Sequence, residues 1–240
     1  MLGAFLWGAG AASSLLIGAL IVLGWNLPRK LVGLVMAFGV GVLISAVSFE
    51  LVDESLHHDG NYAVIAAGFL LGSLVFFSGN LLLNKIGNGR GRAKKEQGSP
   101  LAIFMGTALD GIPESIVLGL GLVGGKTVSM AMLAAIFISN LPEAVASTSD
   151  LKKDKWKPRT ILIMWAVVAV VSGVAALVGF TLFSVLPPAA TAFTMAFAGG
   201  ALLTMLADTM MPEAYRDTGS VAGVLTALGF GVAYALSQLA

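Results

Sequence analysis

Two apolar stretches of this chain are each interrupted by the dipeptide Pro-Glu, at Pro113-Glu114 and at Pro142-Glu143. Asp110 precedes the first glutamate by four residues, and Ser139 precedes the second by the same spacing. Four residues is about one helical turn, so each pair shares one face of a helix. Each proline also frees the backbone carbonyl four positions earlier. Oxygen donors facing one another inside an apolar protein are typical of a site for a hard cation. The candidate ligands are Asp110, Glu114, Ser139 (the weakest), Asn140 and Glu143.

The composition of the chain is that of a membrane protein. Of its 240 residues, 57% are hydrophobic and 11% are charged, which is far more apolar than a soluble globular domain. We therefore expect an all-α, polytopic membrane protein with a single transmembrane domain over 1–240. The sequence contains no cysteine, which excludes a disulfide framework, a thiolate metal site and a cysteine nucleophile.

Eight apolar windows are long enough to cross a bilayer core, and little remains between them for a soluble domain. The N-terminus lacks the basic region of a signal peptide, so we expect the first window to be retained as a helix. We place the eight segments near 3–24, 31–52, 62–85, 100–123, 127–149, 160–184, 190–212 and 220–238.

The basic residues predict the orientation of these segments. Thirteen of the fourteen Lys and Arg residues follow segments 1, 3, 5 and 7, and Lys126 stands alone on the other side. Basic loops remain in the cytoplasm, so both termini are expected outside the cell. The loop over 86–99 is then a basic cytoplasmic loop, and the protein a multi-pass protein of the cell (inner) membrane.

Five acids fall inside the apolar segments, whereas every basic residue lies in a loop or at a segment end. A charge at the bilayer centre costs about 2.5–3.5 kcal/mol on insertion scales. Without a basic partner these acids need a proton, water or a metal cation. Protonated carboxyls bonded across helices are the alternative, but three acids in two Pro-broken helices favour a cation path. The five acids are Glu50, Asp110, Glu114, Glu143 and Asp208.

An acidic stretch that carries both histidines of the chain follows segment 2, on the expected extracytoplasmic side. It can raise the local concentration of metal ions at an entrance. An ordinary solvated loop is the alternative interpretation. The residues concerned are Asp53, Glu54, His57, His58 and Asp59.

The chain also repeats itself at an offset of 159 residues. Met36-Ala37-Phe38, Gly41, Leu43 and Glu54 recur as Met195-Ala196-Phe197, Gly200, Leu202 and Glu213. Segment 2 is expected to run outward and segment 7 inward, so the repeat is inverted. Segments 1–3 and 6–8 would then be two halves around segments 4 and 5. Inverted repeats around discontinuous helices are typical of transporters with a site near the membrane midplane.

These motifs resemble those of the ZIP (Zrt/Irt-like protein) family of divalent metal transporters. The family's H-N-x-P-E-G-type motifs on helices 4 and 5 are similar to D-G-I-P-E-S at 110–115 and S-N-L-P-E-A at 139–144. Its F-E-L-x-P-E and H-E-L-x-P-E segments are similar to S-F-E-L-V-D-E at 48–54 and A-D-T-M-M-P-E at 207–213. The resemblance implies eight helices in a 3+2+3 arrangement with inverted outer triplets and both termini outside. It is also compatible with a homodimer.

The resemblance also implies roles for individual residues. Glu114 and Glu143 match the motif glutamates that ligate or bridge metal. Asp110 stands where the family has a histidine, and Asn140 falls on a position that ligates a second metal. Ser139 replaces a stronger ligand. Acids on the exit side are matched by Asp208 and Glu213, with Glu50 and Glu54 as their counterparts in the first half.

The expected donors are all oxygens, whereas zinc usually takes at least one imidazole or thiolate. Oxygen donors suit Mn²⁺, Fe²⁺ or Mg²⁺ better, and so few of them favour one metal site over a bridged pair. The function expected is transport of a divalent transition-metal cation (Zn, Mn, Fe or similar) toward the cytoplasm. The metal is the substrate, with no permanent cofactor, no nucleic-acid partner and the lipid bilayer as surroundings.

Two other functions are alternatives to transport toward the cytoplasm. A metal exporter or channel on the same scaffold remains open, because ligand identity does not set direction. An intramembrane hydrolase using Ser115 or Ser139 needs a His or Lys base, or membrane-embedded Arg for lipid phosphates. No such residue lies within a segment. We therefore expect a protein that is not an enzyme.

Overall fold

The structure is a computed structural model of the chain and describes residues 1–25, 27–58, 61–87, 111–112, 114–123 and 130–238. Asp59, Asp110, Pro113 and loop residues 88–99 lie outside the described residues, so the predictions made for them stay predictions. The same holds for half of the segment expected near 100–123.

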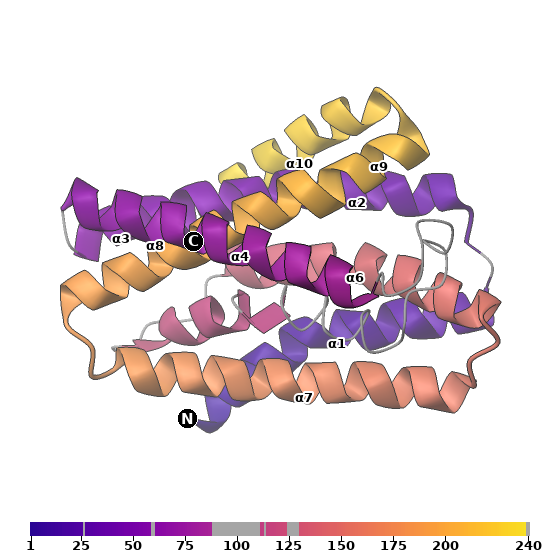
Figure 1. The fold of residues 1–240 in the computed structure, drawn as a ribbon, viewed down its shortest axis with the longest axis horizontal. Helices are drawn as coiled ribbons and strands as arrows, with labels where there is room; N and C mark the ends of the chain where they lie inside the picture. The colour runs from indigo at the N-terminus through magenta and orange to yellow at the C-terminus, as the bar shows by residue number, and fades with distance from the viewer. Residues whose placement is uncertain (26, 59–60, 88–110, 113, 124–129, 239–240) are drawn as a thin grey trace.

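Every element in the described part of the chain is a helix (Figure 1). Two of them, η1 and η3, are π-helical, and residues 114–120 form a further α-helical stretch. The elements are α1 (Leu2–Gly24), α2 (Arg29–Ala46), η1 (Val47–Asp53), α3 (Glu54–His58), α4 (Tyr62–Gly87), α6 (Met130–Lys153), α7 (Pro158–Phe183), α8 (Pro188–Met205), η3 (Leu206–Met210), α9 (Met211–Thr218) and α10 (Val221–Ser237).

Prolines mark the start of three of these helices. Pro28 is the N-cap of α2, and Pro158 and Pro188 are the first residues of α7 and α8. A proline costs little at these positions, because the first N–H groups of a helix have no partner within it. The starts of α2 and α7 therefore come within about two residues of the expected bounds.

The prediction of an all-helical membrane protein is confirmed, but the predicted number of spans is not. Five helices of the described residues are long and apolar enough to cross a membrane, which indicates a membrane protein. They span Leu2–Gly24, Arg29–His58, Tyr62–Leu82, Pro158–Phe183 and Pro188–Thr218. α10 is apolar but has 17 residues, and α6 has 24 residues with Pro142 inside it. The count of eight spans stays a prediction.

The second and seventh segments are longer than expected. Arg29–His58 and Pro188–Thr218 each run as a continuous series of helical turns through a π-helical stretch. Residues 53–58 of the acidic stretch after segment 2 therefore belong to this helix rather than to a loop. The two π-helical stretches begin at Val47 and Leu206, 159 residues apart, which equals the offset of the sequence repeat.

Glycines allow the helices to cross closely. A methyl group added at Gly41 of α2 would overlap the carbonyl oxygen of Thr226 of α10, and one at Gly229 of α10 would overlap that of Phe38. Small residues at such crossings are the usual device by which membrane helices approach one another.

The pair formed by α8 and α4 repeats this arrangement. A methyl group at Gly200 of α8 would overlap the carbonyl oxygen of Phe69, and one at Gly72 of α4 would overlap that of Phe197. Gly41 and Phe38 are the positions 159 residues before Gly200 and Phe197. The two helix pairs therefore use corresponding residues for corresponding contacts.

Two buried clusters hold the bundle together. One joins α2, η1, α6, α8 and η3 with Val117 and Leu118, and the other joins α1, α6 and α7 around Trp165. The indole Nε1 of Trp165 donates to Oγ1 of Thr148 at 2.9 Å, so the polar atom of this buried side chain is satisfied. α6 belongs to both clusters and thus lies at the centre of the bundle.

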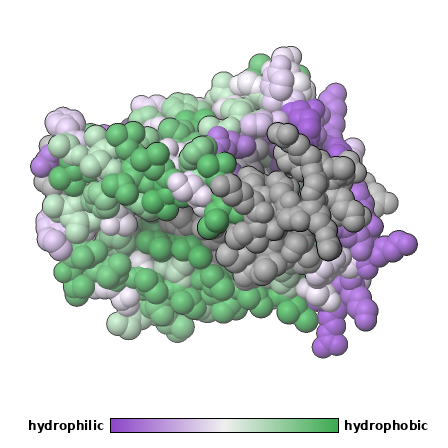
Figure 2. Space-filling model, viewed as in Figure 1, coloured by the Kyte–Doolittle hydropathy of each residue, from purple (hydrophilic) through white to green (hydrophobic). Residues whose placement is uncertain are grey.

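The outer surface of the bundle is largely apolar, and one end is hydrophilic (Figure 2). We call this the basic end; it carries the turns between α1 and α2 and between α6 and α7 (Figure 1). The opposite end is formed by α3, by the last turns of α7 and α10 and by the first turn of α8. We call it the cavity end, for the reason given below.

Candidate functional site

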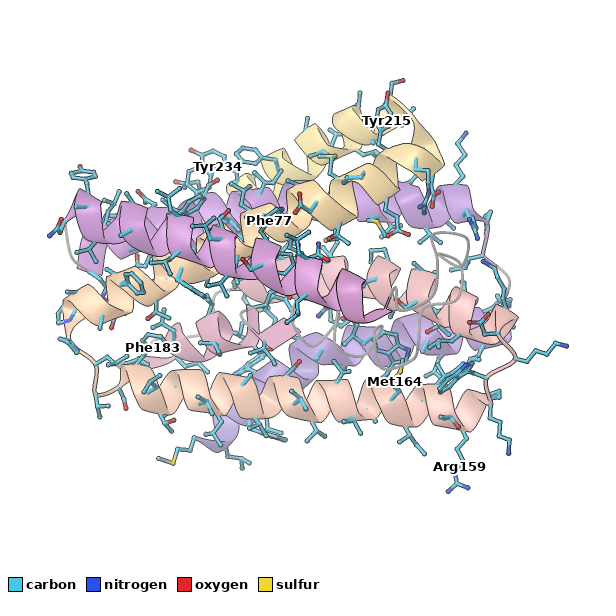
Figure 3. All side chains as sticks on the ribbon, viewed as in Figure 1. Phe77, Arg159, Met164, Phe183, Tyr215 and Tyr234 are labelled. Atoms are coloured by element: carbon cyan, nitrogen blue, oxygen red, sulfur yellow. The ribbon has the colours of Figure 1, made fainter. Side chains whose placement is uncertain are left out.

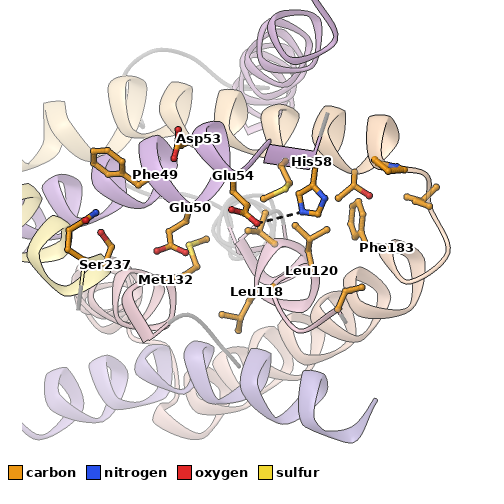
Figure 4. A pocket seen from close by; sticks show the side chains of 18 residues that line it. Phe49, Glu50, Asp53, Glu54, His58, Leu118, Leu120, Met132, Phe183 and Ser237 are labelled. Carbon is orange, nitrogen blue, oxygen red and sulfur yellow. Dashed lines mark ion pairs between the residues drawn. The ribbon is translucent and has the colours of Figure 1, made fainter. Parts of the chain in front are cut away.

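A cavity of about 700 Å³ lies at the cavity end (Figure 4). All its charged side chains come from one helical run, η1 with α3, and its apolar wall comes from residues 117–123, α6, α7 and α8. The polar side chains lining it are Glu50, Asp53, Glu54, His58, Thr191, Ser237 and Gln238. Four of these were predicted as path or entrance residues.

The carboxylates and the imidazole follow one face of this run. Glu50, Glu54 and His58 succeed one another at intervals of four, and Nε2 of His58 lies 3.7 Å from Oε1 of Glu54 (Figure 4). Glu50 and Glu54 are both partly buried. Two carboxylates one turn apart on a cavity wall are oxygen donors of the kind that divalent cations take.

His57 is the exception among the predicted entrance residues. It is exposed, does not line the cavity, and its Nδ1 lies 3.0 Å from the carbonyl oxygen of Asp53. Helical geometry explains the difference, since residues 57 and 58 point about 100° apart. Of the two histidines, His58 is therefore the one in position to meet a cation.

Glu114 lies below the floor of the cavity. Val117 and Leu118 line the cavity and belong to the same buried cluster as Met132 and Ile136 of α6. Glu114 shares their helix face at i−3 and i−4, about 6 Å further along the axis. Its side chain is only 2% exposed.

The polar residues of α6 lie at similar depth. Met132 lines the cavity, and Ser139 and Asn140 follow about two turns later, or about 10 Å. Ser139 is 2% and Asn140 5% exposed, while Glu143 is partly buried. Oγ of Ser139 donates to the carbonyl oxygen of Ile136 at 3.0 Å. Its proton is thus engaged within the helix, and a lone pair remains to meet a cation.

Pro142 does not break α6, in contrast to the expectation of a Pro-broken fifth segment. The helix runs without interruption from Met130 to Lys153. A proline removes one hydrogen bond of the helix, and close neighbours hold the turn on both sides. Gly18 of α1 leaves room for the carbonyl of Leu141, and Gly39 of α2 faces the carbonyl of Ile138. This packing explains why the helix continues.

The predicted exit residues lie toward the basic end. Asp208 is in η3 and is exposed. Glu213 is in α9, and its Oε1 accepts a hydrogen bond from Nη2 of Arg216 at 3.1 Å. Nε of Arg216 also donates to Oδ1 of Asp217 at 3.2 Å. Glu213 therefore has a basic partner one turn away, and neither exit residue lines the cavity.

Among the described residues, no three His, Cys, Asp or Glu side chains are close enough together to form a metal site. Asp110, the third acid of the predicted set, is outside that part of the chain. The structure thus brings Glu50, Asp53, Glu54 and His58 together in the cavity and places Glu114, Ser139 and Asn140 below it.

No protein-family model matches this chain, and no curated protein matches it at a significant level.

Sequence reasoning missed the apolar side of the entrance. Met132, Phe183 and Met195 line the cavity, but they lie in apolar runs that resemble ordinary membrane helix. The π-helical geometry of η1 was missed as well. The signal available in the sequence was the repeat. Two acid-bearing stretches lie 159 residues apart, and both are π-helical in the structure.

Proposed function

We propose that this chain is a transporter that moves a divalent transition-metal cation across a membrane through a carboxylate site. The observation that carries the proposal is the position of Glu114. This carboxylate is buried about one helical turn below the floor of a cavity whose wall bears Glu50 and Glu54. Buried acids inside apolar helices are rare and usually mark ion pathways.

The proposed path begins at the mouth of the cavity. A hydrated cation would meet His58 and Glu54 first and Glu50 one turn deeper. The cation would replace its bound water molecules stepwise with the carboxylate oxygens of Glu54 and Glu50. The free energy of dehydration is then spread over several small steps. Leu118 and Met132 then separate the cavity from Glu114 and from the polar face of α6.

The deeper site would consist of Asp110, Glu114, Asn140 and Glu143, with Ser139 as a weak donor. Such a set offers only oxygen donors, because the amide of Asn140 binds a cation through its oxygen. It favours Mn²⁺ or Fe²⁺ over Zn²⁺, because zinc usually takes an imidazole or thiolate. The cation would leave past Asp208 and Glu213 toward the basic end.

Alternating access through an inverted repeat is part of the same proposal. It is supported by the equal offset of the two π-helical stretches and by the matching contacts of Gly41 and Gly200. Two related halves can rock about a site near the midplane and expose it to one side at a time. The resemblance to the ZIP family of divalent metal transporters points the same way.

The proposed direction of transport is toward the cytoplasm. Basic turns remain in the cytoplasm, so the cavity would open to the outside and would admit a cation from that side. An exporter or a metal-gated channel on the same scaffold is the second candidate, favoured by no observation of its own. We treat the protein as a transporter rather than an enzyme and as compatible with a homodimer.

The test is metal uptake into proteoliposomes with Mn²⁺, Fe²⁺, Co²⁺ and Zn²⁺, for the wild type and for Glu143→Ala. We expect saturable uptake by the wild type, strongest for Mn²⁺ or Fe²⁺, and uptake at the level of empty liposomes for the variant. Asp154→Asn is the matched control, because it removes an acid from the same region of chain at the turn after α6. Normal uptake by Glu143→Ala would exclude the proposed site.

A further inference from the structure

The turn between α6 and α7 has an unusual backbone for its sequence. The N–H of Lys155 donates to the carbonyl of Lys152 and that of Trp156 to the carbonyl of Leu151, both at 3.1 Å. Lys155 has φ of 60°, in the left-handed region. This pair of bonds is the helix-ending motif in which glycine is the favoured residue at the left-handed position. Here a lysine occupies it.

The side chains around Lys155 show what the turn presents. Leu151 is buried, and Trp156 packs against the same apolar cluster between α1, α6 and α7. This apolar contact fixes the turn, and the remaining side chains point outward. Lys153, Lys157 and Arg159 are exposed, as is Lys155, and Asp154 is the only acid between 151 and 160.

Three of these positive charges have no acidic partner among the residues that the structure describes. No ion pair in the described part of the chain involves Lys155, Lys157 or Arg159. Lys152, by contrast, donates from Nζ to the carbonyl of Val22 at the end of α1, at 2.8 Å. Lys157 is also the N-cap of α7, whose first N–H groups receive no side-chain cap. Both the charges and the helix dipole favour an anion here.

An apolar stripe leads away from this charge along α7. Ile163 and Val167 follow Arg159 at intervals of four residues and are 53% and 44% exposed. Figure 3 shows Arg159 projecting from the basic end of α7. A basic rim that continues into an exposed apolar helix face matches a phospholipid, with its charged headgroup at the rim and an acyl chain along the helix. A free phosphate would use only the rim.

We propose that the α6–α7 turn binds the headgroup of an anionic phospholipid through Lys155, Lys157 and Arg159, with an acyl chain against Ile163 and Val167. The left-handed lysine is the feature that separates this site from a general excess of positive charge. It places an ammonium group where backbone preference alone would select glycine. The proposal is independent of metal transport.

The test uses native mass spectrometry of the whole purified protein, titrated with phosphatidylglycerol and, separately, with phosphatidylcholine. We expect phosphatidylglycerol to bind more tightly. Lys155→Gly should weaken it about fivefold while preserving the turn, because a juxtamembrane charge contributes about 1 kcal/mol. Adding Lys157→Gln and Arg159→Gln should weaken it further, with phosphatidylcholine unaffected. Lys30→Gln is the control, since it removes one charge from the same end of the bundle but from the start of α2.

Each alternative outcome overturns the proposal. Equal binding of the two lipids would show that the turn does not select charge. An equal loss in Lys30→Gln and Lys155→Gly would show that net charge alone matters. Competition by millimolar inorganic phosphate as strong as that by phosphatidylglycerol would show a free-anion site. Thermal unfolding of each variant verifies folding, and metal uptake is not needed for any of these readings.

Discussion

A methyl group on Gly229 of α10 would overlap the backbone carbonyl of Phe38 in α2, whereas Gly231, two residues later, has open space around its Cα. The first glycine is therefore required by the crossing of the two helices, and the second is not. The same helix thus provides a test and its control.

We expect Gly229→Ala to lower the unfolding free energy by about 1–3 kcal/mol, because overlap with a backbone atom forces the helices apart. Gly231→Ala should leave it unchanged or raise it slightly, since alanine is the better helix former. Thermal unfolding in detergent compares the two variants. A similar change in both would mean that the α2–α10 crossing is looser than the structure has it.

The hydrogen bond between Trp165 and Thr148 joins α7 to α6 in a buried region. Thr148→Val keeps the shape of the side chain but leaves the indole N–H without its acceptor. We expect a loss of about 1–3 kcal/mol in unfolding free energy, the cost of a buried unsatisfied donor. Thr160→Val, at an exposed position in the first turn of α7, is the control and should have little effect.

Buried Glu114 should be unfavourable for stability and necessary for metal binding. In metal-free protein we expect Glu114→Gln to raise the unfolding free energy by about 1 kcal/mol or more, because a desolvated charge is removed. In the wild type, a metal at about 100 times its dissociation constant should add about 2.7 kcal/mol.

This metal-induced increase should vanish in Glu114→Gln. Thermal unfolding with and without Mn²⁺ measures both effects without any transport assay. A variant that Mn²⁺ stabilises as strongly as the wild type would exclude Glu114 as a ligand.

The absence of cysteine makes single-cysteine variants clean probes of the cavity. We expect Glu50→Cys and Asp53→Cys to react with a membrane-impermeant thiol reagent added from the cavity end. Ser139→Cys, at a buried position, should react at least about tenfold more slowly. Lys157→Cys should react only from the basic end. In spheroplasts, labelling of Lys157→Cys from outside would reverse the proposed orientation.

Much of the fold was predictable because apolar runs and prolines are local signals. The bounds of α1 and α7 followed from the length of their apolar runs. Glu50 was predicted as an acid inside such a run, and Glu54 as part of the acidic stretch that follows it. Two features could not be predicted in this way. α6 continues through Pro142 because α1 and α2 pack against it. The helix that carries Glu213 extends to Thr218, so Arg216, which was expected in a loop, lies one turn from Glu213. The site itself depends on Asp110 and stays a prediction.

At the π-helical stretches η1 and η3, the chain can lose one residue without rotating the part of the helix that follows. A π-helical turn accommodates one residue more than an α-helical turn, so the helices on either side keep the phase of a chain one residue shorter. Deleting one residue within 47–53 should therefore leave Glu54 on the cavity wall. The same deletion within 36–44 would rotate everything beyond it by about 100°. Thermal unfolding of a series of single-residue deletion variants measures this difference. Deletions within η1 and η3 should lower the unfolding temperature little, and deletions elsewhere in the same helices should lower it strongly.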